Sequence, residues 1–446
     1  MSSSATPTAP VVTRGAFSSF QAKGYPTLWW AGLFSFISVQ MQFLLRGILA
    51  WDLTGRESAL GLTYLCFGLA LLIATPLGGV ASDRLSKRAV LIVSQAALML
   101  VAVIMGVAVL TGVVQFWMLL VAAVVQGASF GFFGPARVAI AAEIVGREQL
   151  GNAITLSLLS MNGTRVFAPA LAGVLAGVAT IGIGGAYLIA AIGSMVSFSY
   201  LVRLPKPKPT SAASQATAPR RSANPWVEIV GGVQYVLARR PLRRLVISSF
   251  FVIMFGFNYV AFYPALIKGE YGLGDEWVGY ISSASAMGAV VVSIPLAARA
   301  DSVWAKVAMT IAGLGFGLGV AGVGASPTFW VTFFVICFVG GATTIYQSLS
   351  NTMAMSMTDD AHQGRVQSLM QLSFAGFGIA ALPLGVLAEW IGLRPTIMVM
   401  GAIATLSVVL YGVFEGGWPG LRPKSAAPID TVDDNGAFPV PIAARA

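Results

Sequence analysis

Long apolar runs separated by short polar segments make up most of this chain. A helix needs about 20 mostly apolar residues to cross the roughly 30 Å hydrocarbon core of a bilayer. Twelve runs are long enough, at about residues 27–50, 58–81, 89–111, 115–136, 152–177, 182–202, 245–267, 276–298, 307–325, 328–350, 366–389 and 395–414. The pattern therefore predicts an all-α membrane protein with twelve transmembrane helices.

Parts of the first six runs recur in the last six. The stretch Gly79–Arg88, which joins the second and third runs, has a weaker counterpart at Arg299–Lys306. Gly61 precedes the aspartate of the first stretch by the same interval as Gly279 precedes that of the second. Internal repetition of this kind is typical of transporters. It predicts two six-helix bundles related by a pseudo-two-fold axis.

A second repeat links the fifth run, at residues 169–176, with the eleventh, at residues 382–388. Both stretches carry a proline followed by the sequence Gly-Val-Leu-Ala. The predicted organisation is then two bundles, a linker and two polar tails. These parts cover residues 1–24 (disordered cytoplasmic tail), 25–202 (first bundle), 203–244 (cytoplasmic linker), 245–415 (second bundle) and 416–446 (disordered cytoplasmic tail).

The linker changes character along its length. Its first part is rich in Pro, Ser and Ala, and Asn224-Pro225 then has the form of a helix start. The helix predicted after it has an apolar face and ends among four arginines, Arg239, Arg240, Arg243 and Arg244. Such a helix can lie on the inner leaflet, where arginine meets anionic lipid, or can serve only as a connection. The sequence leaves both readings open.

Charge supports the membrane prediction and sets the orientation. Only 10% of the residues are charged, against about 25% in soluble domains, and the mean hydropathy is +0.80. With the N-terminus inside, the outer loops hold only Arg56, Lys268 and Arg394, and most other bases lie in cytoplasmic segments. This asymmetry places both termini in the cytoplasm. It also accounts for the net charge of +10 without a nucleic-acid partner.

The sequence lacks the usual features of an enzyme. Cys66 and Cys337 both lie in apolar runs, and His362 is the only histidine, so neither a disulfide framework nor a histidine-rich metal site is expected. No phosphate-binding glycine loop or nucleophile elbow occurs. We therefore predict a protein without catalytic residues, metal or cofactor.

The stretch Gly79–Arg88 has the pattern G-x-x-x-D-R-x-x-K-R and resembles the signature loop of the major facilitator superfamily, with Ser86 in place of its second glycine. Three further stretches, at residues 53–61, 133–137 and 162–173, are similar to the branch that contains enterobactin exporters and macrolide efflux proteins. The resemblance covers about residues 18–415. It implies export of small molecules driven by an ion gradient, usually of protons.

The fifth run is also faintly similar to the antiporter motif of the superfamily. Pro169 and Gly173 match that motif, and its other glycines are absent here. Neighbouring branches carry an arginine three residues before the pair Gln126-Gly127, where this chain has Ala123. No carboxylate lies clearly at mid-membrane, and Asp52 is the nearest candidate for coupling. Proton coupling therefore rests on the resemblance.

Charged residues inside spans are costly, by several kcal/mol at the centre, so they are functional candidates. Arg46 shares a helix face with Gln42 in the first span, and we expect this face to line the central cavity. Alternatively Arg46 extends outward or reaches Asp52 as a packing contact. Arg165, with Asn162 one turn earlier, shapes the cavity or only joins helices. Its partner would be Gln126, also expected at the cavity, or the carbonyls freed near Pro169.

The second bundle contributes polar groups without charge. Aromatic and amide side chains recur in spans seven, ten and eleven, and those we expect at the cavity are Asn258, Tyr263, Gln347 and Gln371. A wide, mostly apolar cavity with few polar groups suits amphipathic molecules better than sugars.

The loop between the second and third spans is the predicted cytoplasmic gate. Its members are Gly79, Asp83, Arg84, Lys87 and Arg88. We expect Asp83 to accept hydrogen bonds from a helix N-terminus and the arginines to pair with carboxylates on the inner side. Such contacts would break when the bundles rock.

The sequence thus predicts a monomeric secondary transporter of a bacterial inner membrane. It would export amphipathic small molecules, such as drugs or siderophore-like metabolites, in exchange for protons or another coupling ion. An importer of the same fold is one alternative. A non-transporting membrane receptor or assembly factor is another.

Overall fold

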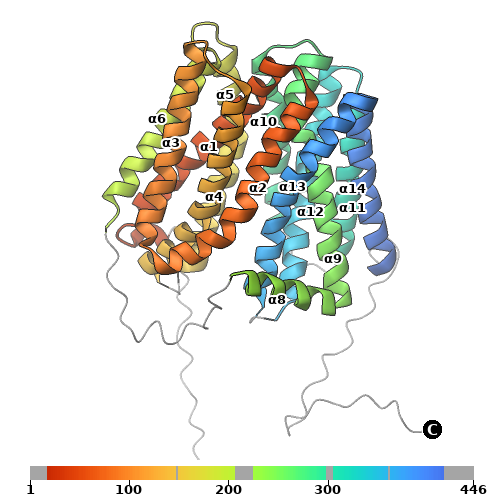
Figure 1. The fold of residues 1–446 in the computed structure, drawn as a ribbon. Coiled ribbons are helices and arrows are strands. Elements are labelled where there is room, and N and C mark those ends of the chain that lie inside the picture. The colour runs from red at the N-terminus through yellow and green to blue at the C-terminus, as the bar shows by residue number, and fades with distance from the viewer. Residues whose placement is uncertain (1–17, 147–148, 206–224, 298–304, 360–361, 416–446) are drawn as a thin grey trace, which may run out of the picture.

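Two six-helix bundles stand side by side in the computed structural model, which describes residues 18–146, 149–205, 225–297, 305–359 and 362–415 (Figure 1). After a short turn, η1 (Ser18–Gln21), the first bundle follows the first six predicted spans. Its helices are α1 (Tyr25–Thr54), α2 (Glu57–Arg84), α3 (Lys87–Leu110), α4 (Phe116–Val145), α5 (Leu150–Gly177) and α6 (Gly182–Arg203).

The second bundle begins with an irregular span. A regular helix, α9 (Arg240–Phe251), continues through a π-helical turn, a 3₁₀ turn and a second π-helical turn. These are η2 (Val252–Gly256), η3 (Phe257–Phe262) and η4 (Ala265–Glu270). The remaining helices are α10 (Asp275–Ala297), α11 (Ala305–Ala325), α12 (Phe329–Ser356), α13 (Gln363–Ile391) and α14 (Leu393–Glu415).

The predicted fold, an all-helical protein with two sets of six spans, is confirmed. Ten helices of the described residues are long and apolar enough to cross a membrane. The other two, α10 and α13, stand in the bundle at the places predicted for spans eight and eleven, and α13 supplies a shorter apolar helix at Gly376–Ile391. The seventh span begins at Arg240, inside the range that the sequence assigned to the linker.

The helix predicted in the linker is present as α8 (Pro225–Ala238), which lies across one end of the second bundle (Figure 1). We call this end, where α1 also begins, the linker end; the opposite end, with the α1–α2 turn at Gly55, is the distal end. Three apolar residues of α8, Val230, Val233 and Leu237, are exposed along one side. Contact of this side with lipid stays a prediction.

The inner side of α8 is fastened to the second bundle by a small polar cluster. Arg239 donates to the Asp359 carboxylate at 2.6 Å, and the hydroxyl of Tyr235 donates to it at 3.0 Å. These hydrogen bonds, that of Arg239 first, lower the pKa of Asp359 below its usual value. The His362 ring stacks on Tyr235 at 4.1 Å between centroids. Because the depressed pKa lies below the neutral range, the pair is ionised at physiological pH and is lost only in acid.

The bundles meet at two crossings, and the first joins α5 to α10. A Cβ added to Gly173 would lie 2.5 Å from the Cα of Gly279, and one added to Gly177 would lie 3.0 Å from the Cβ of Glu276. Only glycine allows two helix backbones to approach so closely. Gly173 is one of the two residues that match the antiporter motif, so its position in this structure is at a contact between bundles.

The second crossing joins α2 to α13 in the same way. A Cβ on Gly61 would lie 2.7 Å from the Cα of Leu382, and one on Gly385 would lie 2.9 Å from the Cα of Ser58. Gly378 lies equally close to the backbone of Gly68. The contacting residues of both crossings lie in the distal halves of their helices. The bundles are therefore closed against each other at the distal end.

Replacement of Gly173 by Ala should force the α5–α10 crossing apart, because the new methyl group would meet backbone atoms that cannot move alone. We expect the variant to favour a conformation opened at the distal end. Distances between spin labels on the distal ends of α5 and α10 would increase. Gly163→Ala is the matched control, since a Cβ there has no atom within 4 Å. Unchanged distances in Gly173→Ala would contradict a tightly packed crossing.

Candidate functional site

Arg46 is a buried cation in the first bundle, with 2% of its surface exposed. Its guanidinium donates to the side-chain oxygen of Gln126 on α4 and faces the rings of Phe43 and Phe67, at 5.5 and 5.7 Å. Its Nε and Nη2 have no hydrogen-bond partner among the described residues. Cation–π contacts and one hydrogen bond offset only part of the cost of burying this charge.

Gln42 lies one turn before Arg46 and is buried as well. Its amide donates to the Ser38 hydroxyl at 3.0 Å, and Ser38 in turn donates to the Ala190 carbonyl of α6 at 2.6 Å. The predicted shared face of Gln42 and Arg46 is therefore turned into the first bundle. In this conformation it packs helices together and is not open to solvent.

Two further arginines extend the positive charge along the first bundle. The guanidinium of Arg137 on α4 lies 4.8 Å from the ring of Phe36 on α1. Arg165, midway along α5, has an exposed side chain. No described residue forms an ion pair with Arg46, Arg137 or Arg165.

A cluster of charges joins the bundles at the distal end. Lys268 of η4 donates to Asp52 of α1, in the first bundle, and to Asp275 of α10, in the second, the latter at 2.5 Å. Ser58 of α2 donates to Glu389 of α13 at 2.5 Å. Together with the glycine crossings, these bonds between bundles close the distal end.

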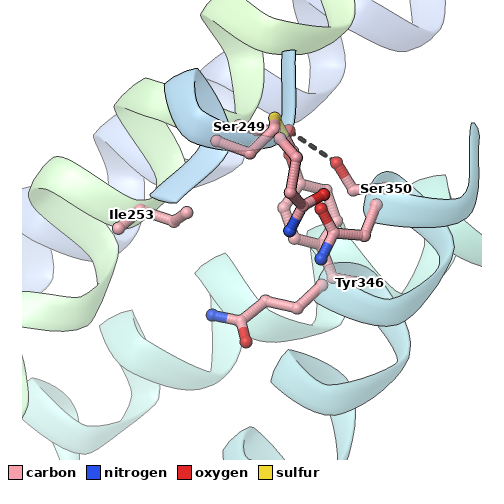
Figure 2. Close-up of a pocket in the computed structure, with 8 residues that line it drawn as sticks. Ser249, Ile253, Tyr346 and Ser350 are labelled. Carbon is pink, nitrogen blue, oxygen red and sulfur yellow. Dashed lines mark hydrogen bonds between the residues drawn. The ribbon is translucent and has the colours of Figure 1, made fainter. Parts of the chain in front are cut away.

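A small polar pocket lies in the linker half of the second bundle, among α9, α12 and α13, and has a cavity volume of about 50 Å³ (Figure 2). It is lined by hydroxyls, amides and two apolar side chains: Ser249, Ile253, Tyr346, Gln347, Ser350, Asn351, Gln367 and Met370. Ser249 and Ser350 share a hydrogen bond of 2.7 Å, and the amide nitrogen of Gln347 has no partner among the described residues. The pocket can therefore donate and accept hydrogen bonds without carrying charge.

Irregular backbone borders this pocket. Ser249 lies near the end of α9, and Ile253 lies in the π-helical turn that follows it. The amide of Asn258 donates to the carbonyls of Met254 and Phe377, at 2.5 and 3.1 Å, and so supports the distorted turn. π-helical turns are frequent at functional sites because they re-aim side chains.

Comparison with known proteins decides the family. The model of the Major Facilitator Superfamily matches residues 28–375 and 245–437. The chain belongs to this superfamily. It is 24% identical to the enterobactin exporter EntS of Shigella flexneri over 330 residues, which cover 73% of this chain and 75% of that protein. It is 25% identical to EntS of Salmonella typhi over 361 residues, 79% of this chain and 82% of that one.

Solved structures share the fold at low sequence identity. A bacterial homologue of the human lysosomal transporter Spinster, in an inward-facing and unoccupied conformation, has a TM-score of 0.69 at 14% identity, covering 91% of this chain and 98% of that one. The nucleoside transporter NupG has a TM-score of 0.66 at 12% identity, with 88% and 98% covered. The protein is therefore a multi-pass membrane transporter and not an enzyme.

The superfamily loop makes contacts only within the first bundle, as far as its side chains are described. Lys87 forms an ion pair with Glu143 of α4. In this conformation Arg88 donates to the carbonyls of Leu201 and Val202 at the end of α6. A cation is stabilised there by the partial negative charge of a helix C-terminus. The pairing of Arg88 with a carboxylate on the inner side, expected when the opposite end is open, stays a prediction. A Cβ on Gly79 would meet nothing within 4 Å.

Several predicted residues have no described side chain. These are Asp83, Arg84, Asn162 and Gln371, and most of the counterpart loop Arg299–Lys306 also lies outside the described residues. Tyr263 is buried against the ring of Tyr259, and its hydroxyl has no hydrogen-bond partner among the described residues. Among the predicted cavity residues of the second bundle whose side chains are described, Gln347 alone lines the pocket.

Two pairings that the sequence offered as options are not formed in this structure. Gln126 accepts a hydrogen bond from Arg46, and no described hydrogen bond joins it to Arg165. Asp52 binds Lys268, not Arg46. The importance of Lys268 was missed, since it was counted only as a base of an outer loop. The pocket hydroxyls Ser249 and Ser350 were also missed, although Tyr346 and Ser350 share a spacing of one helical turn on α12.

Loss of the Gln126 side chain should leave the Arg46 guanidinium without its hydrogen bond. We expect Gln126→Leu to lower the free energy of unfolding by about 1–3 kcal/mol, the cost of an unsatisfied buried group. The double variant Arg46→Met, Gln126→Leu should recover most of this loss, because both partners are then apolar. Thermal unfolding of the purified full chain measures both. Additive losses in the double variant would contradict the coupling.

Proposed function

We propose that this chain is a secondary active transporter that exports amphipathic small molecules by alternating access in a bacterial inner membrane. The arrangement of the two bundles carries this proposal. They are closed by glycine crossings and charge pairs at the distal end, and a polar pocket lies in the linker half. A site accessible from one side while the other is closed is the basis of alternating access.

The direction of transport is inferred from two observations. Arginines and lysines concentrate at the linker end, which favours a cytoplasmic position for that end and for both termini. The EntS relatives are named as enterobactin exporters. On this orientation the conformation is inward-facing, and the pocket would receive its substrate from the cytoplasm. We propose that the monomer is the transporting unit.

The chemistry of the pocket suits molecules with a large apolar part. Its hydroxyls and amides offer a few hydrogen bonds beside Ile253 and Met370. A sugar would require many paired donors and acceptors, whereas an amphipathic molecule requires few. Drugs and siderophore-like metabolites fit this description.

The pair of Asp52 with Lys268 is the candidate for coupling to protons. It connects the bundles at the distal end, so it must break when that end opens. Protonation of Asp52 from outside would remove the attraction and ease opening. Such a link would tie proton entry to the change of state without a carboxylate at mid-membrane.

Flux into and out of proteoliposomes under an imposed pH gradient tests this function. With a panel of dyes, macrolides and siderophores, we expect transport out of the compartment that faces the linker end, faster when the opposite side is acidic. Accumulation in the reverse direction would identify an importer. Absence of substrate-dependent flux across the panel would favour a non-transporting receptor or assembly factor.

Replacement of Asp52 by Asn should uncouple transport from the pH gradient. The neutral amide keeps a hydrogen bond to Lys268 but cannot exchange a proton, so we expect flux that no longer responds to the gradient. Asp275→Asn is the matched control, because Asp275 also binds Lys268 but belongs to the same bundle. An Asp52→Asn variant that responds to pH like the unmodified protein would exclude this coupling site.

Replacement of Gln347 by Leu should weaken substrate binding at the pocket. We expect KM to rise about tenfold with little change in kcat, since about 1.4 kcal/mol of hydrogen bonding is lost in the ground and transition states alike. Ser348→Ala is the control, because this neighbouring residue of α12 is exposed and does not line the pocket. Equal KM values for the two variants would place the substrate elsewhere.

A further inference from the structure

Positive and negative charges are distributed very differently along the spans. Every carboxylate with a described side chain lies near one or the other of the two ends of the molecule. Six are at the distal end and two at the linker end: Asp52, Glu57, Glu270, Asp275, Glu276 and Glu389, and then Glu143 and Asp359. Three arginines of the first bundle lie between these ends. Among the described residues, the membrane interior of that bundle is therefore purely cationic.

The three arginines form a ladder. Tyr25 and Trp29 of α1 donate to the carbonyls of Ala153 and Leu156 on α5, which sets the relative heights of these helices. At a rise of 1.5 Å per residue, Arg165 lies about 14 Å further along α5 than Leu156.

The other two arginines lie on either side of Arg165 along the length of the first bundle. Arg137 lies against Gly32 of α1, close to the linker end. Arg46 lies about 21 Å further along α1 than Gly32, by the same rise. The ladder therefore runs Arg137, Arg165, Arg46 from the linker end toward the distal end.

No carboxylate among the described side chains balances this cationic interior. At least three of the five guanidinium hydrogens of Arg46, the one on Nε and the two on Nη2, face no acceptor among the described residues. Buried cations are normally paired, because an unpaired one is strongly destabilising in an apolar interior. A transporter can retain such groups when a passing ligand supplies the missing charge.

The described part of the second bundle has no such groups. Its described bases, among them Lys268, Lys306 and Arg394, lie at helix ends, and its pocket carries only hydroxyls and amides. The two bundles thus offer different chemistry to one molecule. The first offers guanidinium groups beside the rings of Phe36, Phe43 and Phe67, and the second offers neutral hydrogen bonds.

We propose that the transported molecule is an organic anion, whose acidic group passes from Arg137 to Arg165 and Arg46 while its apolar part contacts the neighbouring rings. This rests on the proposed function and names its substrate class. A guanidinium binds a carboxylate or sulfonate through parallel hydrogen bonds, and the aromatic rings accept the apolar part.

The negative charge of the substrate also favours export. In a cell whose interior is negative, the membrane potential favours the exit of an anion. Export of an organic anion would therefore gain driving force from the potential as well as from any proton exchange. An imposed potential, negative on the side of the linker end, should then accelerate efflux of the substrate.

Two xanthene dyes of similar size and opposite charge test the proposal in proteoliposomes containing the full chain. We expect the anionic carboxyfluorescein to be transported at least tenfold faster than the cationic rhodamine 123. Arg165→Gln should abolish this preference, and Arg165→Lys should restore part of it. Arg165 is exposed, so its variants should fold. Arg46→Gln tests the contact of the acidic group with the buried arginine nearest the distal end. Arg240→Gln, at an exposed position outside the ladder, is the control.

The outcomes separate the substrate class from the function. Faster transport of the cationic dye, or an Arg165→Gln variant with unchanged preference, would overturn the anion proposal while export itself stood. If neither dye moved, the protein would not transport molecules of this kind. A binding measurement would then show whether the site prefers an anion. In that case benzoate, but not the neutral benzamide, should raise the melting temperature of the unmodified protein and not that of Arg165→Gln. Equal effects of the two compounds would reject an anion site.

Discussion

Close contact between helix backbones at the distal end is the constraint on which the rest of this structure depends. At the α5–α10 and α2–α13 crossings, glycines allow approaches that any side chain would prevent. In lipid, helices gain little from burying apolar surface against one another, so packing of this kind holds bundles together. Because both crossings lie in the distal halves, the linker halves remain free to separate. The accessible pocket and the closed end are two consequences of the same contacts.

The internal repeat acquires a physical meaning at these crossings. Gly61 and Gly279 hold equivalent positions in the two halves of the sequence, as do Gly173 and Gly385. In the structure each of these glycines lies at a contact between bundles, and Gly173 meets Gly279 directly. The repeat therefore preserves the residues that let one half close on the other. The charge pair of Lys268 with Asp52, which is not part of the repeat, helps to close the same end.

Chemical function is divided unequally between the two similar halves. The first bundle contains arginines that form no ion pair with any described residue, and the second contains a neutral polar pocket beside a distorted span. Pseudo-symmetry of the fold thus does not extend to the side chains that would meet a substrate. A site between unlike walls can bind a molecule whose two ends differ, which is the character of an amphipathic ligand.

The sequence by itself determined the class of protein, the spans and the repeat. A chain of this kind crosses a bilayer as long apolar helices, in which the backbone polar groups are hydrogen-bonded within each helix. It also marked Arg46 and Arg165, since charge inside a span is visible in one dimension. Only the tertiary structure decided the partners. Gln126 binds Arg46 and not Arg165, and Asp52 binds Lys268, because pairing depends on which helix faces which at a given depth. That choice arises from packing between segments far apart in the chain, and no local pattern encodes it.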